Sequence, residues 1–105
     1  MLVYTTYPSL VEAEQAGRAI VAMRIAACVN ILPGMVSHYW WQGEVVRGEE
    51  VVMLLKTRAS LTDKVCAAVR ERHPYDTPAI LTLPLEWVDP AYHAWIVAET
   101  GGNPA

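Results

Sequence analysis

The sequence predicts an α+β fold in which helices pack on one antiparallel sheet. Two observations predict it. Short segments rich in β-branched and aromatic residues alternate with segments whose apolar residues recur at the three-and-four spacing of a helix face. A chain of 105 residues also has the length of one domain, which buries about two-thirds of its unfolded surface in a single two-layer core. We therefore expect residues 1–105 to form one domain.

The first third of the chain predicts a strand, a helix and a second strand. The segment LVYTTY (2–7) is β-branched and aromatic and ends at a proline, as strands often do. Ser9 and Glu12 have the spacing of a capping box, and helical periodicity follows, so we predict a helix over 9–26. CVNIL (28–32) then returns to the composition of a strand.

The middle of the chain predicts a long hairpin. The Pro-Gly pair at 33–34 bends the strand, extended composition continues over 36–46, and the Arg-Gly pair at 47–48 allows a turn. EVVMLLKT (50–57) is a continuous apolar run, which indicates a strand buried on both faces.

The last third predicts a helix, a strand and an additional helix. The second helix begins near Ser60 and must end before Pro74, and AILTLPL (79–85) is the fourth strand. Asp89 is the N-cap of a third helix over 90–99, whose first residue is a proline. The order β-α-β-β-α-β with an appended helix is that of a ferredoxin-like sandwich.

Composition argues against several classes of function. The net charge is −3 and the basic residues are scattered, so we expect no nucleic-acid binding. We also expect no membrane segment, and Cys28 and Cys66, which form no CxxC pair, suggest free buried thiols in the cytoplasm. The sequence has no Ser-His-Asp spacing and no glycine-rich phosphate loop, so we expect no enzymatic activity.

Tyr39, Trp40 and Trp41 predict a surface that another chain covers. Tandem tryptophans in a strand face opposite ways, so both cannot enter one core. At ~3.3 Å per residue the extended run 28–46 would span about 60 Å, whereas a domain of this size is about 35 Å across. The strand should therefore project beyond the helices, and its exposed edges should pair with another subunit.

Four ordered blocks, AACVNILPG, SHYWWQGEV, LLKTR and RHPYDTPAILTLPL, resemble the CutA divalent-cation-tolerance family over nearly the whole chain. The resemblance implies a homotrimer, similar in architecture to PII-type signalling proteins. It also implies a role in tolerance of copper and other divalent metals, with no agreed catalytic chemistry and no required cofactor.

His73 and Cys28 are the candidate metal ligands, because imidazole suits Cu²⁺ and thiolate suits Cu⁺. His73 stands in the HPY block of the family, but some relatives carry a second histidine where this chain has Arg72, which cannot bind a metal. Near Thr5 this chain also lacks a cysteine that some relatives have. Two alternatives remain: His73 interacts with the last carbonyls of the preceding helix, and Cys28 is a small packed residue.

Lys56, Tyr75 and Asp76 suggest a different site. They lie in blocks that carry the resemblance, and they predict a polar cleft between subunits that binds a small anion, as in a PII-like sensor or adaptor. The alternative is an ion pair between Lys56 and Asp76 at the end of a strand. Asp76 also departs from the family pattern, which often has glutamate there.

Overall fold

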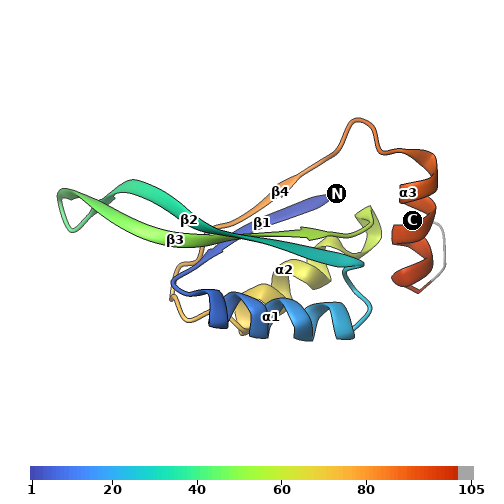
Figure 1. The fold of residues 1–105 in the computed structure, drawn as a ribbon, viewed down its shortest axis with the longest axis horizontal. Coiled ribbons are helices and arrows are strands. Elements are labelled where there is room, and N and C mark those ends of the chain that lie inside the picture. Colours follow the sequence, from blue (N-terminus) through green and yellow to red (C-terminus); the bar gives the residue numbers. More distant parts are fainter. Residues whose placement is uncertain (102–105) are drawn as a thin grey trace.

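The computed structural model describes residues 1–101 (Figure 1). Its elements are β1 (Leu2–Tyr7), α1 (Leu10–Ala22), β2 (Cys28–Trp41), β3 (Glu44–Lys56), a 3-10 turn (Ala59–Leu61), α2 (Thr62–Glu71), β4 (Ile80–Leu83) and α3 (Pro90–Glu99). This order of strands and helices is the predicted one.

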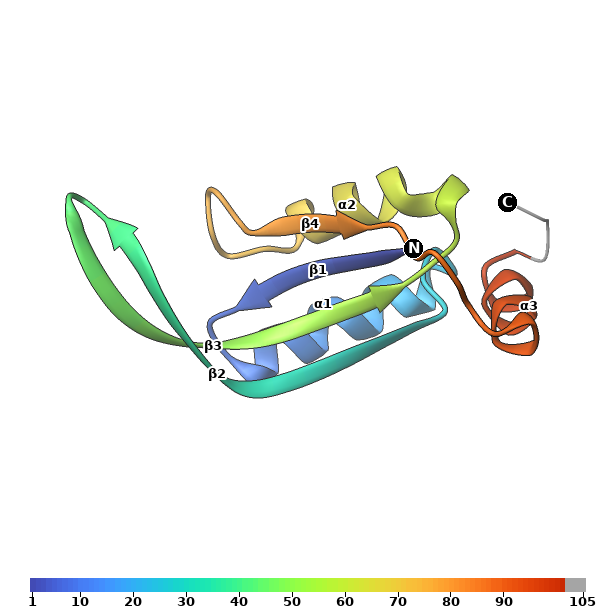
Figure 2. The same cartoon turned by 90° about the horizontal axis from the view of Figure 1, so that it is seen from above.

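The four strands form one antiparallel sheet in the order β2-β3-β1-β4. Helices α1 and α2 lie together below the sheet in Figure 1, and α3 lies at the end of the sheet opposite the β2-β3 hairpin (Figures 1 and 2). The predicted α+β fold with an antiparallel sheet and three helices is confirmed.

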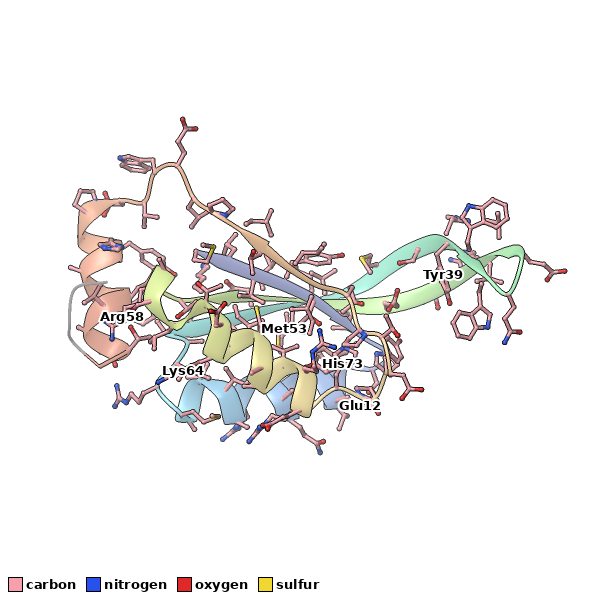
Figure 3. All side chains as sticks on the ribbon, turned by 180° about the vertical axis from the view of Figure 1, so that it is seen from behind. Glu12, Tyr39, Met53, Arg58, Lys64 and His73 are labelled. Carbon is pink, nitrogen blue, oxygen red and sulfur yellow. The ribbon has the colours of Figure 1, made fainter. Side chains whose placement is uncertain are left out.

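The hydrophobic core lies between the sheet and helices α1 and α2 (Figure 3). Alternate residues of the central strands point into it, because successive side chains of a strand face opposite ways. Val3, Met53 and Leu55 supply the strand side of the core and are fully buried. The helices supply residues at helical spacing, among them Ile20 from α1 and Val65 from α2.

The other face of the sheet is not covered by a helix within residues 1–101; we call it the open face. Its apolar side chains include Leu2, Tyr4, Leu32, Met35, Val52, Leu54, Leu81 and Leu83. Leu81 is 57% exposed and Leu32 is 53% exposed. The prediction that residues 50–57 are buried on both faces is therefore wrong for the single chain, because both core helices pack on the same side.

The hairpin turn lies at Gln42-Gly43, directly after Trp41. Both turn residues have positive φ, 49° and 82°, as a two-residue hairpin turn matched to strand twist requires. The predicted turn at the later Arg-Gly pair is wrong. Gly48 is instead inside β3, where a Cβ would lie 3.3 Å from the ring of Tyr39, so the glycine makes room for that ring.

The predicted bend near residue 33 is confirmed as a β-bulge. Leu32 pairs with Val52 and Met35 pairs with Glu50, so β2 contains one more residue than β3 across this interval. Gly34 has φ 87°. Beyond the bulge the hairpin projects past the helices, as predicted, and gives the molecule extents of 46 × 26 × 22 Å (Figures 1 and 2).

The bulge also decides which way the aromatic side chains face. Residues opposite each other in antiparallel strands point to the same side of the sheet. Glu50 lies on the open face, so its partner Met35 does too, and alternation then puts Tyr39 and Trp41 on that face. Trp40 points to the opposite face. The predicted separation of the two tryptophans is confirmed.

Helix α1 begins as predicted but ends earlier. Ser9 Oγ accepts a hydrogen bond from Glu12 N at 3.2 Å, which caps the first turn. The helix ends at Ala22, whereas residues 9–26 were predicted. Arg24 has φ 63°, a left-handed conformation that stops the helix, and its guanidinium pairs with Glu99 at 2.8 Å.

No helix within residues 1–101 is long and apolar enough to span a membrane.

Candidate functional site

His73 lies against the end of β1, with both ring nitrogens in hydrogen bonds. The backbone N–H of Tyr75 donates to Nδ1 at 3.2 Å, so Nε2 carries the proton and donates to the carbonyl of Thr6 at 2.5 Å. The ring also stacks on Tyr7, with centroids 4.3 Å apart. His73 thus joins the loop after α2 to β1, rather than interacting with the last carbonyls of α2, as the alternative interpretation held.

Beside His73, the buried hydroxyl of Tyr7 has no hydrogen-bond partner within residues 1–101. Burial raises the pKa of this phenol to about 12, although the nearby charge of Arg72 acts in the opposite direction. A buried hydroxyl without a partner costs about 1–3 kcal/mol, because it leaves its hydrogen bonds to water behind.

We expect Tyr7→Phe to raise the free energy of unfolding by about 1 kcal/mol at pH 7, because the change removes that hydroxyl and keeps the ring. Urea unfolding measures it. Tyr4→Phe is the matched control, since the Tyr4 hydroxyl has a partner, Met35 Sδ at 3.5 Å. A lower free energy of unfolding in Tyr7→Phe would instead show that the Tyr7 hydroxyl has a hydrogen-bond partner.

At alkaline pH the free energy of unfolding of the wild type should fall further below that of Tyr7→Phe. The pKa of Tyr7 is raised from 10.0 to about 12 in the folded state, so the unfolded chain loses this proton first as pH rises. Stability is therefore lost between pH 10 and 12, by about 1.4 kcal/mol at pH 11 relative to Tyr7→Phe.

Cys28, in β2, lies level with Leu2, whereas His73 contacts Thr6 near the other end of β1. These two levels are four residues apart, or about 13 Å along the strand at 3.3 Å per residue, and β3 also lies between β2 and β1. The Cys28 Sγ donates to Asn30 Oδ1 at 3.8 Å. Both Cys28 and Cys66 are free and only partly buried, so the expectation of buried thiols is too strong. Within residues 1–101, no three His, Cys, Asp or Glu side chains gather as metal ligands.

Lys56 also lies at the Cys28 end, where it contacts α3. Its Nζ donates to the Tyr92 hydroxyl at 3.0 Å and lies 5.2 Å from the centre of that ring. This hydrogen bond raises the pKa of Lys56 above its usual value. The ion pair with Asp76, the alternative for Lys56, does not form, because Asp76 lies near the other end of the sheet.

Tyr75 and Asp76 line a cleft of about 780 Å³ between the projecting hairpin and the loop from α2 to β4. We call it the aromatic cleft. The side chains that matter to its chemistry are Thr6, Tyr39, Trp41, Glu50, Tyr75 and Asp76. It unites the predicted residues Tyr75 and Asp76 with the predicted interface residues Tyr39 and Trp41, but it does not include Lys56.

Glu50 is held in place at the wall of this cleft. Ser37 Oγ donates to Oε1 at 3.1 Å, and the Tyr75 hydroxyl donates to Oε2 at 3.4 Å. Burial raises the pKa of Tyr75, and the negative charge of Glu50 raises it further. The donors come from β2 and from the loop after α2, so two elements fix one carboxylate.

Trp40 is 75% exposed and Trp41 is 60% exposed. Tyr39 is less exposed because its ring lies over Gly48. The single chain thus leaves both tryptophans largely uncovered, as the sequence indicates.

Residues 1–99 match the family described as CutA1 divalent ion tolerance protein. The chain belongs to this family. It is 41% identical over 100 residues to the divalent-cation tolerance protein CutA of Thermus thermophilus, covering 95% of this chain and 97% of that one. A solved structure of the divalent cation tolerance protein (Cut A1) of the same organism superposes with a TM-score of 0.89 at 41% identity, and it too covers 95% of this chain and 97% of that one.

Some CutA relatives are much longer than this chain. The chloroplastic protein CutA 1 of rice, Oryza sativa subsp. japonica, is 36% identical over 100 residues, which cover 95% of this chain but 56% of the rice protein. The chain therefore spans little more than half of that relative.

Two residues that the structure places at these sites, Glu50 and Tyr92, are not among those predicted from the sequence. A signal existed for Glu50: strand alternation opposite the core residues Val51, Met53 and Leu55 puts it on the other face. No local signal places Tyr92 beside Lys56, because 36 residues separate them.

Proposed function

We propose that this protein acts in divalent-cation tolerance as a cytoplasmic homotrimer with a ferredoxin-like subunit, binds copper weakly, and catalyses no reaction. Membership of the CutA1 family supports the role in tolerance. T. thermophilus CutA is named for divalent-cation tolerance, whereas the rice relative is named as chloroplastic.

The uncovered apolar surface supports the trimer, and it is the observation that carries the proposal. The open face presents at least eight apolar side chains, and the hairpin beyond the bulge adds Tyr39 and Trp41 on the same side. An apolar surface of this kind on a small protein marks a contact with another chain. Closure by rotation then gives a symmetric ring of copies, and we take three from the family resemblance.

The hydrogen bonds at both ring nitrogens of His73 support copper binding that is weak rather than tight. A copper ion that binds either ring nitrogen must displace the hydrogen bond to Thr6 or the one from Tyr75, and each is worth about 1 kcal/mol. Cys28 is too far from His73 to bind the same ion in one chain. We therefore propose that the ligands come from more than one subunit.

We expect Cu²⁺ titration calorimetry to give a weak site that His73→Ala weakens about tenfold or more. His93→Ala is the matched control, because His93 is an exposed residue of α3 and belongs to no proposed site. Equal copper affinity in the wild type and His73→Ala would remove His73 from the site.

A second candidate is a PII-like sensor or adaptor that binds a small anion between subunits. Lys56 favours it, because this ammonium has no carboxylate partner within residues 1–101. Lys56 can share a cleft with Tyr75 and Asp76 only if different subunits supply them. A thermal-shift panel of divalent metals and anionic metabolites separates the two candidates, since a ligand of the folded state raises the melting temperature.

A further inference from the structure

The charges on the open face lie toward its two ends. Among the strand residues that the structure describes on this face, the only cation is Lys56 and the only carboxylates are Glu44 and Glu50. Lys56 lies beside α3, whereas both glutamates belong to the hairpin half of β3. Glu50 and Lys56 are six residues apart on one strand, about 20 Å at 3.3 Å per residue, so they cannot pair within one chain.

Neither Lys56 nor Glu50 meets an opposite charge within residues 1–101. Lys56 donates to the neutral Tyr92 hydroxyl, and Glu50 accepts from the neutral hydroxyls of Ser37 and Tyr75. The proposed trimer covers the open face, so it removes both charges from water. A charge buried without a partner strongly destabilises an assembly, whereas an opposite charge in contact offsets much of that cost. The assembly therefore needs a contact that brings Lys56 of one copy to a carboxylate of another.

The aromatic cleft has the chemistry to receive that lysine. Glu50 and Asp76 line it together with aromatic rings, and none of its described lining residues is lysine, arginine or histidine. Glu50 is half-buried and its two oxygens are already held by hydrogen bonds, whereas Asp76 is exposed, so Glu50 is the better-ordered partner. A lysine carries a compact charge at the end of a flexible four-carbon stem, so it can enter a cleft of about 780 Å³, where the rings also attract a cation.

We propose that Lys56 of one subunit inserts into the aromatic cleft of the next and pairs with Glu50 there. This inference rests on the proposed homotrimer and names a contact that orders its subunits. Each subunit gives one lysine and receives one, as a head-to-tail ring requires. A Lys56 that is paired in this way is not available to the small anion of the PII-like candidate.

Charge reversal tests the pair, with sedimentation equilibrium at micromolar concentration as the measurement. Lys56→Glu and Glu50→Lys should each weaken assembly at least about a hundredfold, because each places like charges in contact. The double variant restores opposite charges and should recover the wild-type mass. A double variant that assembles no better than the single variants, although folded by circular dichroism, overturns the pair.

Glu49 gives the matched control for Glu50. It points to the opposite face, its side chain is 71% exposed and it pairs with Arg47. Glu49→Lys should keep the wild-type mass, and it should not restore assembly to Lys56→Glu. Recovery with Glu49→Lys as complete as with Glu50→Lys would show an effect of net charge alone and would overturn the proposal.

Two further variants separate the pair from its surroundings. Tyr92→Phe removes the hydroxyl that Lys56 contacts and changes no charge, so it should keep the wild-type mass. Its dissociation would assign the effect of Lys56→Glu to the contact with α3 and would contradict the pair. Glu44→Lys places the same reversal at the hairpin end of the open face. Recovery of Lys56→Glu by Glu44→Lys, and not by Glu50→Lys, would overturn the choice of Glu50.

Cross-linking of the wild-type protein needs no variant to fold. A water-soluble carbodiimide joins an amine to a carboxylate only when the two are in contact, so mass spectrometry should find Lys56 linked to Glu50 in cross-linked dimers and trimers. Lys56 linked only to other carboxylates would overturn the pair. A wild-type trimer that survives Lys56→Glu keeps the proposed function and removes this contact alone, whereas a wild-type monomer removes both.

Discussion

Trp41→Asp will dissociate the proposed trimer or unfold it. The wild-type protein should sediment at equilibrium with a mass near three times 11.6 kDa at micromolar concentration, and the variant should not. Trp41 lies on the open face near the tip of the hairpin, at the surface proposed to meet a neighbour. An unpaired carboxylate buried in such an interface typically costs about 3–5 kcal/mol, enough to disrupt a small assembly.

Trp87→Asp controls for the loss of a tryptophan and the gain of a charge. Trp87 is 74% exposed in the loop between β4 and α3, and no proposal involves it, so the variant should keep the wild-type mass. A wild-type mass near 11.6 kDa would contradict the trimer. The open face and the projecting hairpin would then have no common explanation.

Leu55→Ala should lower the free energy of unfolding by about 2–5 kcal/mol. Leu55 is fully buried in the core beneath the helices, so truncation removes apolar contacts and leaves a cavity. Leu10→Ala, at an exposed position in the first turn of α1, should change stability by only about 0.5 kcal/mol. Urea unfolding of both variants measures the difference, and similar losses would show that Leu55 is not central to the core.

The sequence predicts the elements of this fold well because their signals are local. Ser9 caps α1, and Asp89 caps α3 by accepting hydrogen bonds from the backbone N–H groups of Ala91 and Tyr92, as the sequence indicates. The two largest errors at element ends also have local causes. Gln42 is not one of the residues typical of a hairpin turn, and Arg24 is not typical of a left-handed helix end.

The candidate sites are less predictable, because their contacts join distant parts of the chain. His73 meets a carbonyl 67 residues away, and Tyr75 meets Glu50 across 25 residues. Whether β3 is covered on one face or two depends on where both helices pack. The apolar run 50–57 cannot show this, since a partner chain and a second layer of helices would favour the same composition.

The bulge between Leu32 and Met35 absorbs one extra residue of β2 without changing which β3 residue each later β2 residue faces. Deleting Gly34 would remove the bulge, but Met35 would still lie opposite Glu50, so Tyr39 and Trp41 would stay on the open face. Deleting Ser37, where the pairing is regular, would instead turn every later β2 side chain to the other face. Trp40 would then point to the open face, while Tyr39 and Trp41 would leave the proposed interface. We therefore expect a one-residue deletion to be tolerated at the bulge and to disrupt the assembly when it lies between the bulge and the tip.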